Sequence, residues 1–125
     1  MAQTGNKGEW SEIYTFLKLL GEGIVYAGDQ NLNKIQDLFY PIIMILRHEK
    51  DGDYNYRLQN KDVVIQTPAG EELLRIPASV FLSEAENLLK AINENDGAFA
   101  IPQIETFMNS IYCYSLKAKS FPSLI

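Results

Sequence analysis

Residues 6–20 of the chain, NKGEWSEIYTFLKLL, decide how its first part folds. Large apolar side chains recur in this stretch at the spacing of one face of a helix. They are Trp10, Ile13, Tyr14, Leu17 and Leu20. The stretch therefore predicts an amphipathic helix whose apolar face packs into the core of the protein.

Two acidic residues, Glu9 and Glu12, lie three positions apart, so they share the first part of this helix. Acidic side chains there are stabilised by the positive end of the helix dipole, which is a purely structural explanation. The alternative is that one carboxylate faces a metal ion or a phosphate. Glu12 lies a turn deeper beside the apolar face, so we expect it to be held more firmly than Glu9.

The middle of the chain is harder to assign. Residues 21–31 contain three glycines and are predicted to form a connector. Residues 32–40 have apolar side chains at helical spacing, which predicts a short helix. Pro41 marks a change of conformation, because the residue before a proline avoids the helical region. The apolar run 41–46 fits a buried strand or a helix continuing after a kink, and the unbroken helical register favours the helix.

Residues 51–77 change to an alternating pattern interrupted by turn residues. Short runs at 54–58, 63–65 and 73–76 have the alternation or the β-branched content of strands. The turns between them are rich in Asp, Asn, Gly and Pro. These runs predict an antiparallel meander of three strands.

Two further helices are predicted after the meander. Ser83 and Glu86 form a capping box, so a helix is expected from Ser83 to about Asn95. Pro102 suits the first turn of a last helix, on which Cys113 would be a small core residue. The helix faces predict further core residues at Phe39, Leu88, Phe107 and Ile111. The fold class predicted is α+β, mostly helical with a small antiparallel β-meander, in one domain over residues 1–125.

Composition sets limits on the class of protein. The 125 residues are 46% hydrophobic and 22% charged, which is ordinary for a globular domain with a core. No apolar run approaches the ~20 residues of a membrane span. The N-terminus lacks the pattern of a signal peptide. With a single cysteine there is no disulfide framework, so a cytoplasmic location is expected.

Charge and motif content exclude several functions. The net charge is −5, and the lysines and arginines are scattered, with Arg47 and Lys50 as the nearest approach to a cluster. A free-standing DNA-binding module would show a basic patch, so this class is disfavoured. One cysteine and one histidine cannot supply a zinc site, and no phosphate-binding loop is present.

Several segments in the same order resemble the HpaII-type restriction endonucleases. They are NKGEWSE at 6–12, LNKIQDLFYPI at 32–42, IP at 76–77 and IETFMNSI at 104–111. The resemblance extends over nearly the whole chain, to about Ser120. It implies the N-terminal part of a type II enzyme that cuts double-stranded DNA at CCGG with Mg²⁺.

The resemblance also suggests roles for the front of the first helix. In similar nucleases a helix near the N-terminus contributes a glutamate to the catalytic group. This implies a catalytic role for Glu12 or Glu9, with Glu12 as the metal ligand. It further implies that Asn6 and Lys7 contact the DNA.

The chain departs from the family pattern near its end. Residues 117–120, KAKS, match, but residues 121–125, FPSLI, do not resemble the lead-in to the family's catalytic strands. The resemblance implies that the catalytic Asp and Lys would lie beyond Ser120, so the chain alone is expected to be inactive. Its expected partners are then the missing C-terminal portion or a second copy. The alternative function is a stand-alone interaction or structural module without catalysis.

Overall fold

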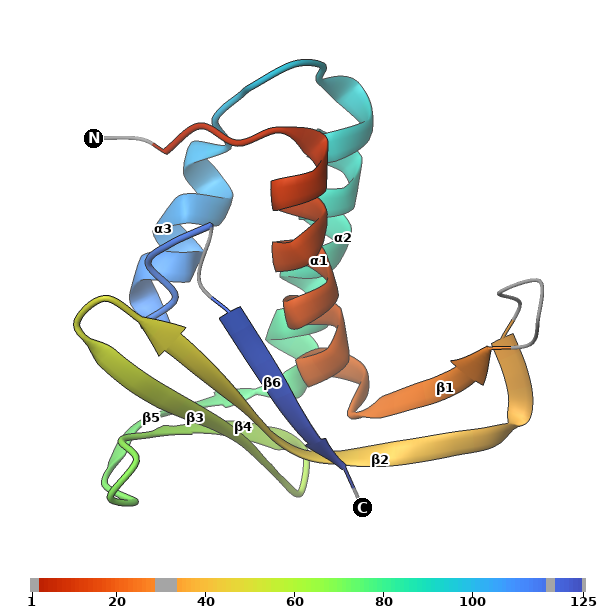
Figure 1. Cartoon of the computed structure of the whole chain (residues 1–125), viewed down its shortest axis with the longest axis vertical. Coiled ribbons are helices and arrows are strands. Elements are labelled where there is room, and N and C mark those ends of the chain that lie inside the picture. Colours follow the sequence, from red (N-terminus) through yellow and green to blue (C-terminus); the bar gives the residue numbers. More distant parts are fainter. Residues whose placement is uncertain (1–2, 29–33, 117–118, 125) are drawn as a thin grey trace.

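The computed structural model describes residues 3–28, 34–116 and 119–124. In chain order the elements are α1 (Lys7–Glu22), β1 (Ile24–Gly28), β2 (Lys34–Glu49), β3 (Gly52–Gln59), β4 (Asp62–Gln66), β5 (Glu72–Pro77), α2 (Ala78–Glu94), α3 (Pro102–Ser110) and β6 (Lys119–Leu124). Figure 1 shows α1 and α2 side by side over a sheet, with α3 beside them. The predicted α+β class is confirmed.

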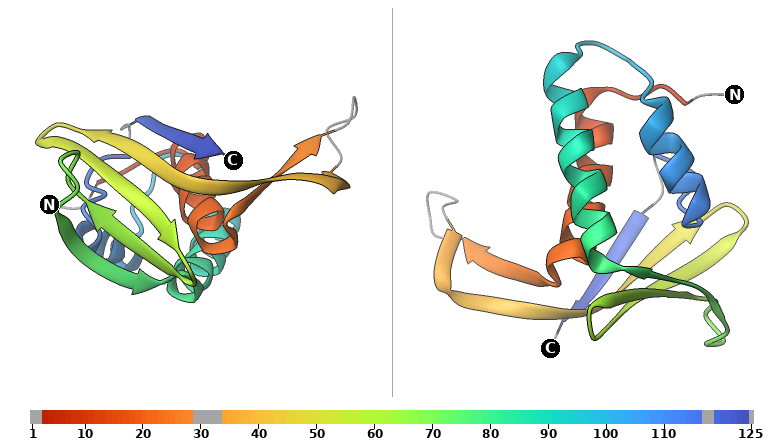
Figure 2. Two further views of the ribbon diagram at one scale, coloured as in Figure 1. Left: turned by 90° about the horizontal axis from the view of Figure 1, so that it is seen from below. Right: turned by 180° about the vertical axis from the view of Figure 1, so that it is seen from behind.

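The sheet is antiparallel and larger than the three-stranded meander predicted. Its strand order is β1-β2-β3-β4-β5, and β6 also pairs with β2. The first part of β2 pairs with β1, where Ile24 lies opposite Pro41. The last part lies between β3 and β6, so Ile45 has both Tyr56 and Pro122 as neighbours. The paired β1 and β2 project from the rest of the molecule (Figure 2).

Three predicted regions are confirmed. The first helix forms where residues 6–20 indicated it, as α1. The predicted meander is present as β3, β4 and β5. The last helix begins at Pro102, which occupies its first turn as expected.

The predictions for residues 34–46 were wrong, because this stretch is strand rather than helix. Residues 34–40 and the run 41–46 belong to one continuous strand, β2. The apolar residues fit a helical register, but isoleucine and aromatic residues also favour strands. Sheet partners on both edges decide between the two, and such partners cannot be identified from local periodicity.

The connector predicted over residues 21–31 is also corrected. Gly21 belongs to α1, and β1 follows almost at once. A Cβ atom on Gly21 would lie 2.5 Å from Leu82 Cγ, so this glycine allows α1 and α2 to approach closely. Gly23 does end the helix, with a left-handed backbone at φ 73°.

The second helix begins earlier than the capping box at Ser83 predicted. It starts at Ala78, directly after β5, and has no side-chain cap. The Ala78 N–H instead donates to the Lys61 carbonyl in the β3–β4 turn, at 2.8 Å. The β3–β4 turn therefore accepts one backbone N–H of this helix end, whereas a side-chain cap was expected at Ser83. The predicted end near Asn95 is confirmed.

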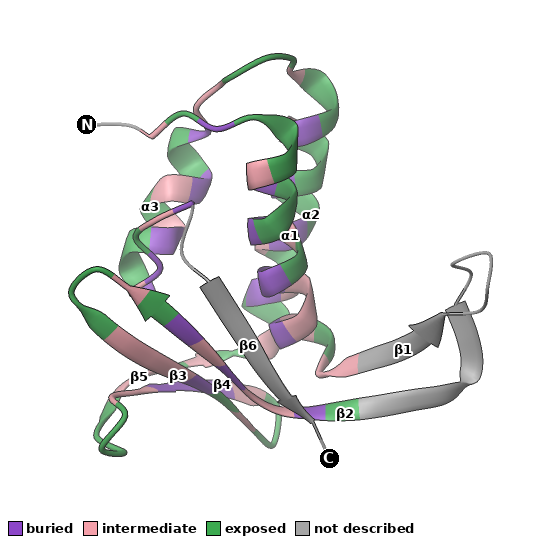
Figure 3. Ribbon diagram, in the orientation of Figure 1, coloured by how far each residue is buried: buried purple, intermediate pink, exposed green. Residues whose placement is uncertain are grey.

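The core lies where the helices meet the sheet, and Figure 3 shows its buried positions. The predicted core residues Trp10, Leu17, Leu88 and Ile111 are fully buried, whereas Phe107 is partly buried against them. The Phe39 side chain lies outside the part of the chain that the structure describes. Cys113 is buried as predicted, although α3 has ended before it.

Candidate functional site

The N-terminal turn of α1 is organised by a capping box. The Glu9 N–H donates to Asn6 Oδ1 at 2.8 Å, and the Asn6 N–H donates to the Glu9 carboxylate at 3.1 Å. Each residue thereby satisfies a backbone donor at the helix end. Two of the residues predicted for catalysis and DNA binding are therefore engaged in holding the helix N-terminus.

Trp10 fixes this turn to the rest of the protein. Its indole Nε1 donates to the Phe99 carbonyl at 3.0 Å, and the two rings stack with centroids 6.4 Å apart. Gly5 and Phe99 also exchange both backbone hydrogen bonds, each 3.0 Å long. The turn that bears Asn6, Lys7 and Glu9 is consequently held against the α2–α3 loop.

Glu12 is placed differently from what the sequence predicted. Its side chain is exposed and has no ion pair with any residue that the structure describes, so it is not the better held of the two glutamates. One turn along, Phe16 is buried and packs edge-on against Tyr56, with ring centroids 4.9 Å apart. Residues four apart share a helix face, so Glu12 lies next to the layer in which α1 meets the sheet.

Lys7 forms a surface ion pair. Its Nζ lies 3.3 Å from an Asp96 carboxylate oxygen, and both side chains are well exposed. Exposed pairs of this kind contribute little to stability, so a phosphate group could displace Asp96 from Lys7 at small cost.

A second polar group lies inside the core and was not anticipated. Arg47 Nε donates to Glu49 Oε2 at 2.7 Å, and the two side chains are only 2% and 1% exposed. The guanidinium also lies over the Phe16 ring, 5.0 Å from its centroid. Arg47 is thus unavailable to form the surface basic cluster with Lys50 that the sequence suggested.

Two ionisable groups next to this pair are strongly shifted. Burial raises the pKa of the Cys113 thiol to about 12, against the opposing charge of Arg47, and Glu49 adds to the rise. Burial also raises the pKa of Tyr56, whose hydroxyl donates to the Ile111 carbonyl at 2.7 Å. Both groups are therefore neutral at pH 7, and neither is suited to nucleophilic chemistry.

One hollow among the described residues lies away from the predicted site. It measures about 710 Å³ and is lined by the end of α1, the β3–β4 turn and the start of α2, including Glu22, Lys61 and Ser79. Glu9 and Glu12 lie at the other end of α1. The predicted residues share one helix end, and the further carboxylate that the described contacts place there is Asp96, which pairs with Lys7.

Within the described residues, no three His, Cys, Asp or Glu side chains are grouped so that they could hold a metal ion. The described helices also include none that is long and apolar enough to cross a membrane.

Comparison with known proteins identifies the family. The model of the HpaII restriction endonuclease family matches residues 6–123. The match therefore includes residues 121–123, which were expected not to resemble the family. No solved structure matches the chain significantly.

A curated relative supports the same assignment. The chain is 40% identical over 119 residues to a protein from Haemophilus parainfluenzae named type II restriction enzyme HpaII. The alignment covers 94% of this chain but 33% of the relative, so the chain spans about one third of the relative's length. On both comparisons, the chain belongs to the HpaII restriction endonuclease family.

Proposed function

We propose that this chain forms the N-terminal part of a type II restriction endonuclease that cleaves double-stranded DNA at CCGG with Mg²⁺. The observation that carries the proposal is the family match over residues 6–123. The 40% identity to an enzyme named HpaII supports the CCGG site, which the family resemblance implies. The cleavage activity belongs to a polypeptide of the relative's full length.

In this proposal Glu12 is the residue of α1 that takes part in cleavage. Its carboxylate is exposed, whereas the Glu9 carboxylate accepts the Asn6 N–H in the capping box. A carboxylate that is already engaged at the helix end is the poorer candidate for a metal ligand. Glu12 would therefore act as ligand, and Glu9 would hold the turn in place.

Asn6 and Lys7 are proposed to contact a DNA phosphate. Both lie at the N-terminus of α1, where backbone N–H groups and the helix dipole favour anions. The Lys7 ammonium is exposed and paired with a carboxylate on the surface, so it can exchange that partner for a phosphate. The Trp10–Phe99 contacts would keep these groups in position.

The described residues do not by themselves fit a complete Mg²⁺ site. Mg²⁺ prefers octahedral oxygen ligands, often one or two carboxylates together with substrate phosphates. Glu12 would supply one carboxylate, and no described His, Cys, Asp or Glu side chains form a group of three with it. The remaining ligands would come from DNA and from the part of the relative's length that this chain does not span.

Self-association gains no support from the described surface. The large apolar side chains that are more than a third exposed in the described part are Val80, Leu89 and Tyr114. Val80 and Leu89 lie on α2, whereas Tyr114 follows α3, and each is only slightly above that fraction. We propose the C-terminal part of the enzyme as the protein partner, because the chain spans about one third of the relative's length.

The test is a chimera in which this chain replaces the matching N-terminal third of the Haemophilus parainfluenzae relative. We expect the chimera to cut a duplex containing CCGG in Mg²⁺ and to leave a duplex with a scrambled site intact. EDTA should stop the reaction. A folded chimera that leaves the CCGG duplex whole, or cuts both duplexes equally, would contradict the proposed function.

A further inference from the structure

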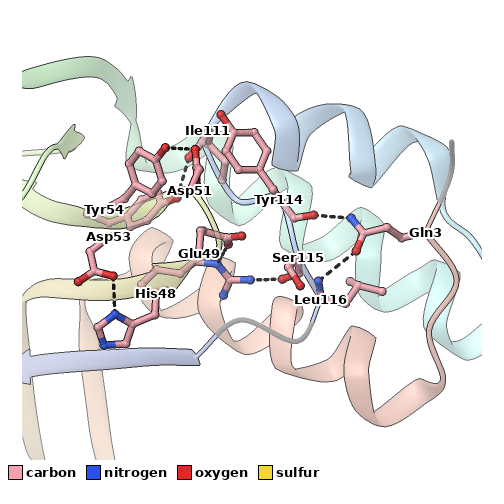
Figure 4. A network of polar contacts seen from close by, with 12 residues as sticks. Gln3, His48, Glu49, Asp51, Asp53, Tyr54, Ile111, Tyr114, Ser115 and Leu116 are labelled. Carbon is pink, nitrogen blue, oxygen red and sulfur yellow. Dashed lines mark hydrogen bonds and ion pairs between the residues drawn. The ribbon is translucent and has the colours of Figure 1, made fainter.

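Three consecutive residues after α3, 114–116, are held by side chains from distant parts of the chain. Gln3 Nε2 donates to the Tyr114 carbonyl at 2.5 Å, and Gln3 Oε1 accepts the Leu116 N–H at 3.3 Å. Between them, Arg47 Nη2 donates to the Ser115 carbonyl at 2.5 Å. Figure 4 shows these contacts around Gln3, Ser115 and Glu49. Side chains therefore bind the backbone groups that a helix or sheet would otherwise pair.

The ion pair behind Ser115 is not explained by stability alone. The Arg47 and Glu49 side chains are almost fully buried, and removing two charges from water has a large cost before their attraction offsets it. Apolar residues of similar volume often serve a core equally well. Among the described residues, the guanidinium is directed at Glu49, at the Ser115 carbonyl and at the Phe16 ring. Such an arrangement is suited to fixing the position of a segment.

The segment held in this way leads directly to β6. This strand begins at Lys119, three residues after Leu116, and Ser120 lies opposite Arg47 itself. Its pairing with β2 is irregular, with a register shift between Ile42 and Met44. Pro122 removes one backbone donor from it. The strand's own hydrogen bonds therefore specify its register weakly, and a fixed entry point would specify it strongly.

We propose that Arg47, braced by Glu49, acts together with Gln3 to fix the register of β6 on β2 by holding residues 114–116. Arg47 lies on β2 and binds the Ser115 carbonyl just before β6. One side chain therefore fixes the position of β6 relative to β2. Gln3 hydrogen-bonds to the residues on either side of Ser115, Tyr114 and Leu116.

The test is hydrogen exchange, followed by mass spectrometry, on the whole chain and on R47M/E49L. This double substitution replaces both charges with apolar side chains of similar size, so the core can stay filled while the grip on Ser115 is lost. We expect amides in 114–124 to exchange at least about tenfold faster, through local opening of β6. Amides in β3 and β4 should keep their rates.

Two further variants make the result specific. Gln3→Ala removes the contacts to Tyr114 and Leu116 without changing the core, and should also speed exchange in 114–124. Arg75→Met is the matched control, because Arg75 is ion-paired with Asp62 and Glu72 on the exposed side of β5. It should leave 114–124 unchanged.

The outcomes separate a positioning role from a general structural one. Unchanged exchange in 114–124 in both R47M/E49L and Gln3→Ala would overturn the proposal. An equal rise in β3, β4 and β6 would overturn it as well, because the pair would then support the whole core rather than one strand. If R47M/E49L does not fold, Gln3→Ala alone decides, by whether its effect is confined to 114–124.

Discussion

Asn6 and Glu9 cap each other at the start of α1, each accepting the other's backbone N–H through its side chain. Asn6→Ala removes the acceptor for the Glu9 N–H and should lower the free energy of unfolding by about 0.5–2 kcal/mol. Asn6→Ser is the matched control, because serine caps helices well and should retain most of the stability. Urea unfolding measures both, and equal loss in the two variants would show that the cap is not what Asn6 contributes.

Leu17 lies at the centre of the buried face of α1 and has no exposed surface. Leu17→Ala should lower the free energy of unfolding by about 2–5 kcal/mol, because it leaves a cavity as well as removing apolar contacts. Leu89→Ala is the control, since Leu89 is 40% exposed on α2 and its loss should cost less than about 0.5 kcal/mol. A Leu17→Ala variant as stable as the parent in urea would contradict the packing of α1.

Local patterns were sufficient where one side of an element meets water. The apolar face of α1 and the alternation in β3 were predicted for this reason, whereas β4 was predicted from its β-branched residues. Local patterns failed at β2, whose last part lies between its sequence neighbour β3 and the distant strand β6. In a helix, the positions of Ile45, Arg47 and Glu49 would not predict that the three side chains share one face. Once β2 is a strand, the same positions direct all three toward the core.

In the candidate site, too, local features could be predicted from the sequence and contacts between distant residues could not. The resemblance drew attention to the front of α1, and the Asn6–Glu9 capping box could have been recognised from its spacing. The expectation that Glu12 is better held than Glu9 failed, because its position on the helix face is exposed. The grip of Gln3 on residues 114–116 joins positions more than a hundred residues apart in the chain, so no local pattern predicts it.

The buried thiol of Cys113 makes stability depend on pH in the alkaline range. An unperturbed cysteine ionises near pH 9.0, whereas burial raises the pKa of Cys113 to about 12 in the folded protein. The stabilisation is therefore complete below pH 9 and is lost as the pH rises toward 12. Each pH unit in that window should lower the free energy of unfolding by about 1.4 kcal/mol.

Urea unfolding of the parent and of Cys113→Ala at several pH values checks this dependence. The variant should be less stable below pH 9 because it has a cavity, so the comparison concerns the slope with pH rather than the absolute value. Between about pH 9 and 10, before most tyrosines ionise, the free energy of unfolding of the variant should fall less steeply with pH than that of the parent. Parallel curves would show that Cys113 does not carry the effect.

Glu12 should matter more to cleavage than Glu9 in the chimera with the Haemophilus parainfluenzae relative. Glu12→Gln keeps the size of the side chain but removes the charge that would bind Mg²⁺, so kcat should fall by at least about a hundredfold. Glu9→Gln can still complete the capping box, because glutamine also accepts a hydrogen bond there, and should cut nearly normally. Cleavage of the CCGG duplex at the parent rate by the Glu12 variant would remove Glu12 from the site.

The 125-residue chain by itself should not cut DNA. Phosphodiester hydrolysis needs several ligands converging on the metal together with charge stabilisation at the phosphate. In our proposal this chain contributes one exposed carboxylate, Glu12, to that group, and members of such a group do not compensate for one another. Approach to the DNA is also opposed, because the chain carries a net charge of −5 and its Arg47 is buried. Purified chain incubated with the CCGG duplex and Mg²⁺ should leave it whole, whereas the chimera cuts the same duplex. Site-specific cutting by the chain alone, stopped by EDTA and by Glu12→Gln, would show that the complete active site lies within these residues.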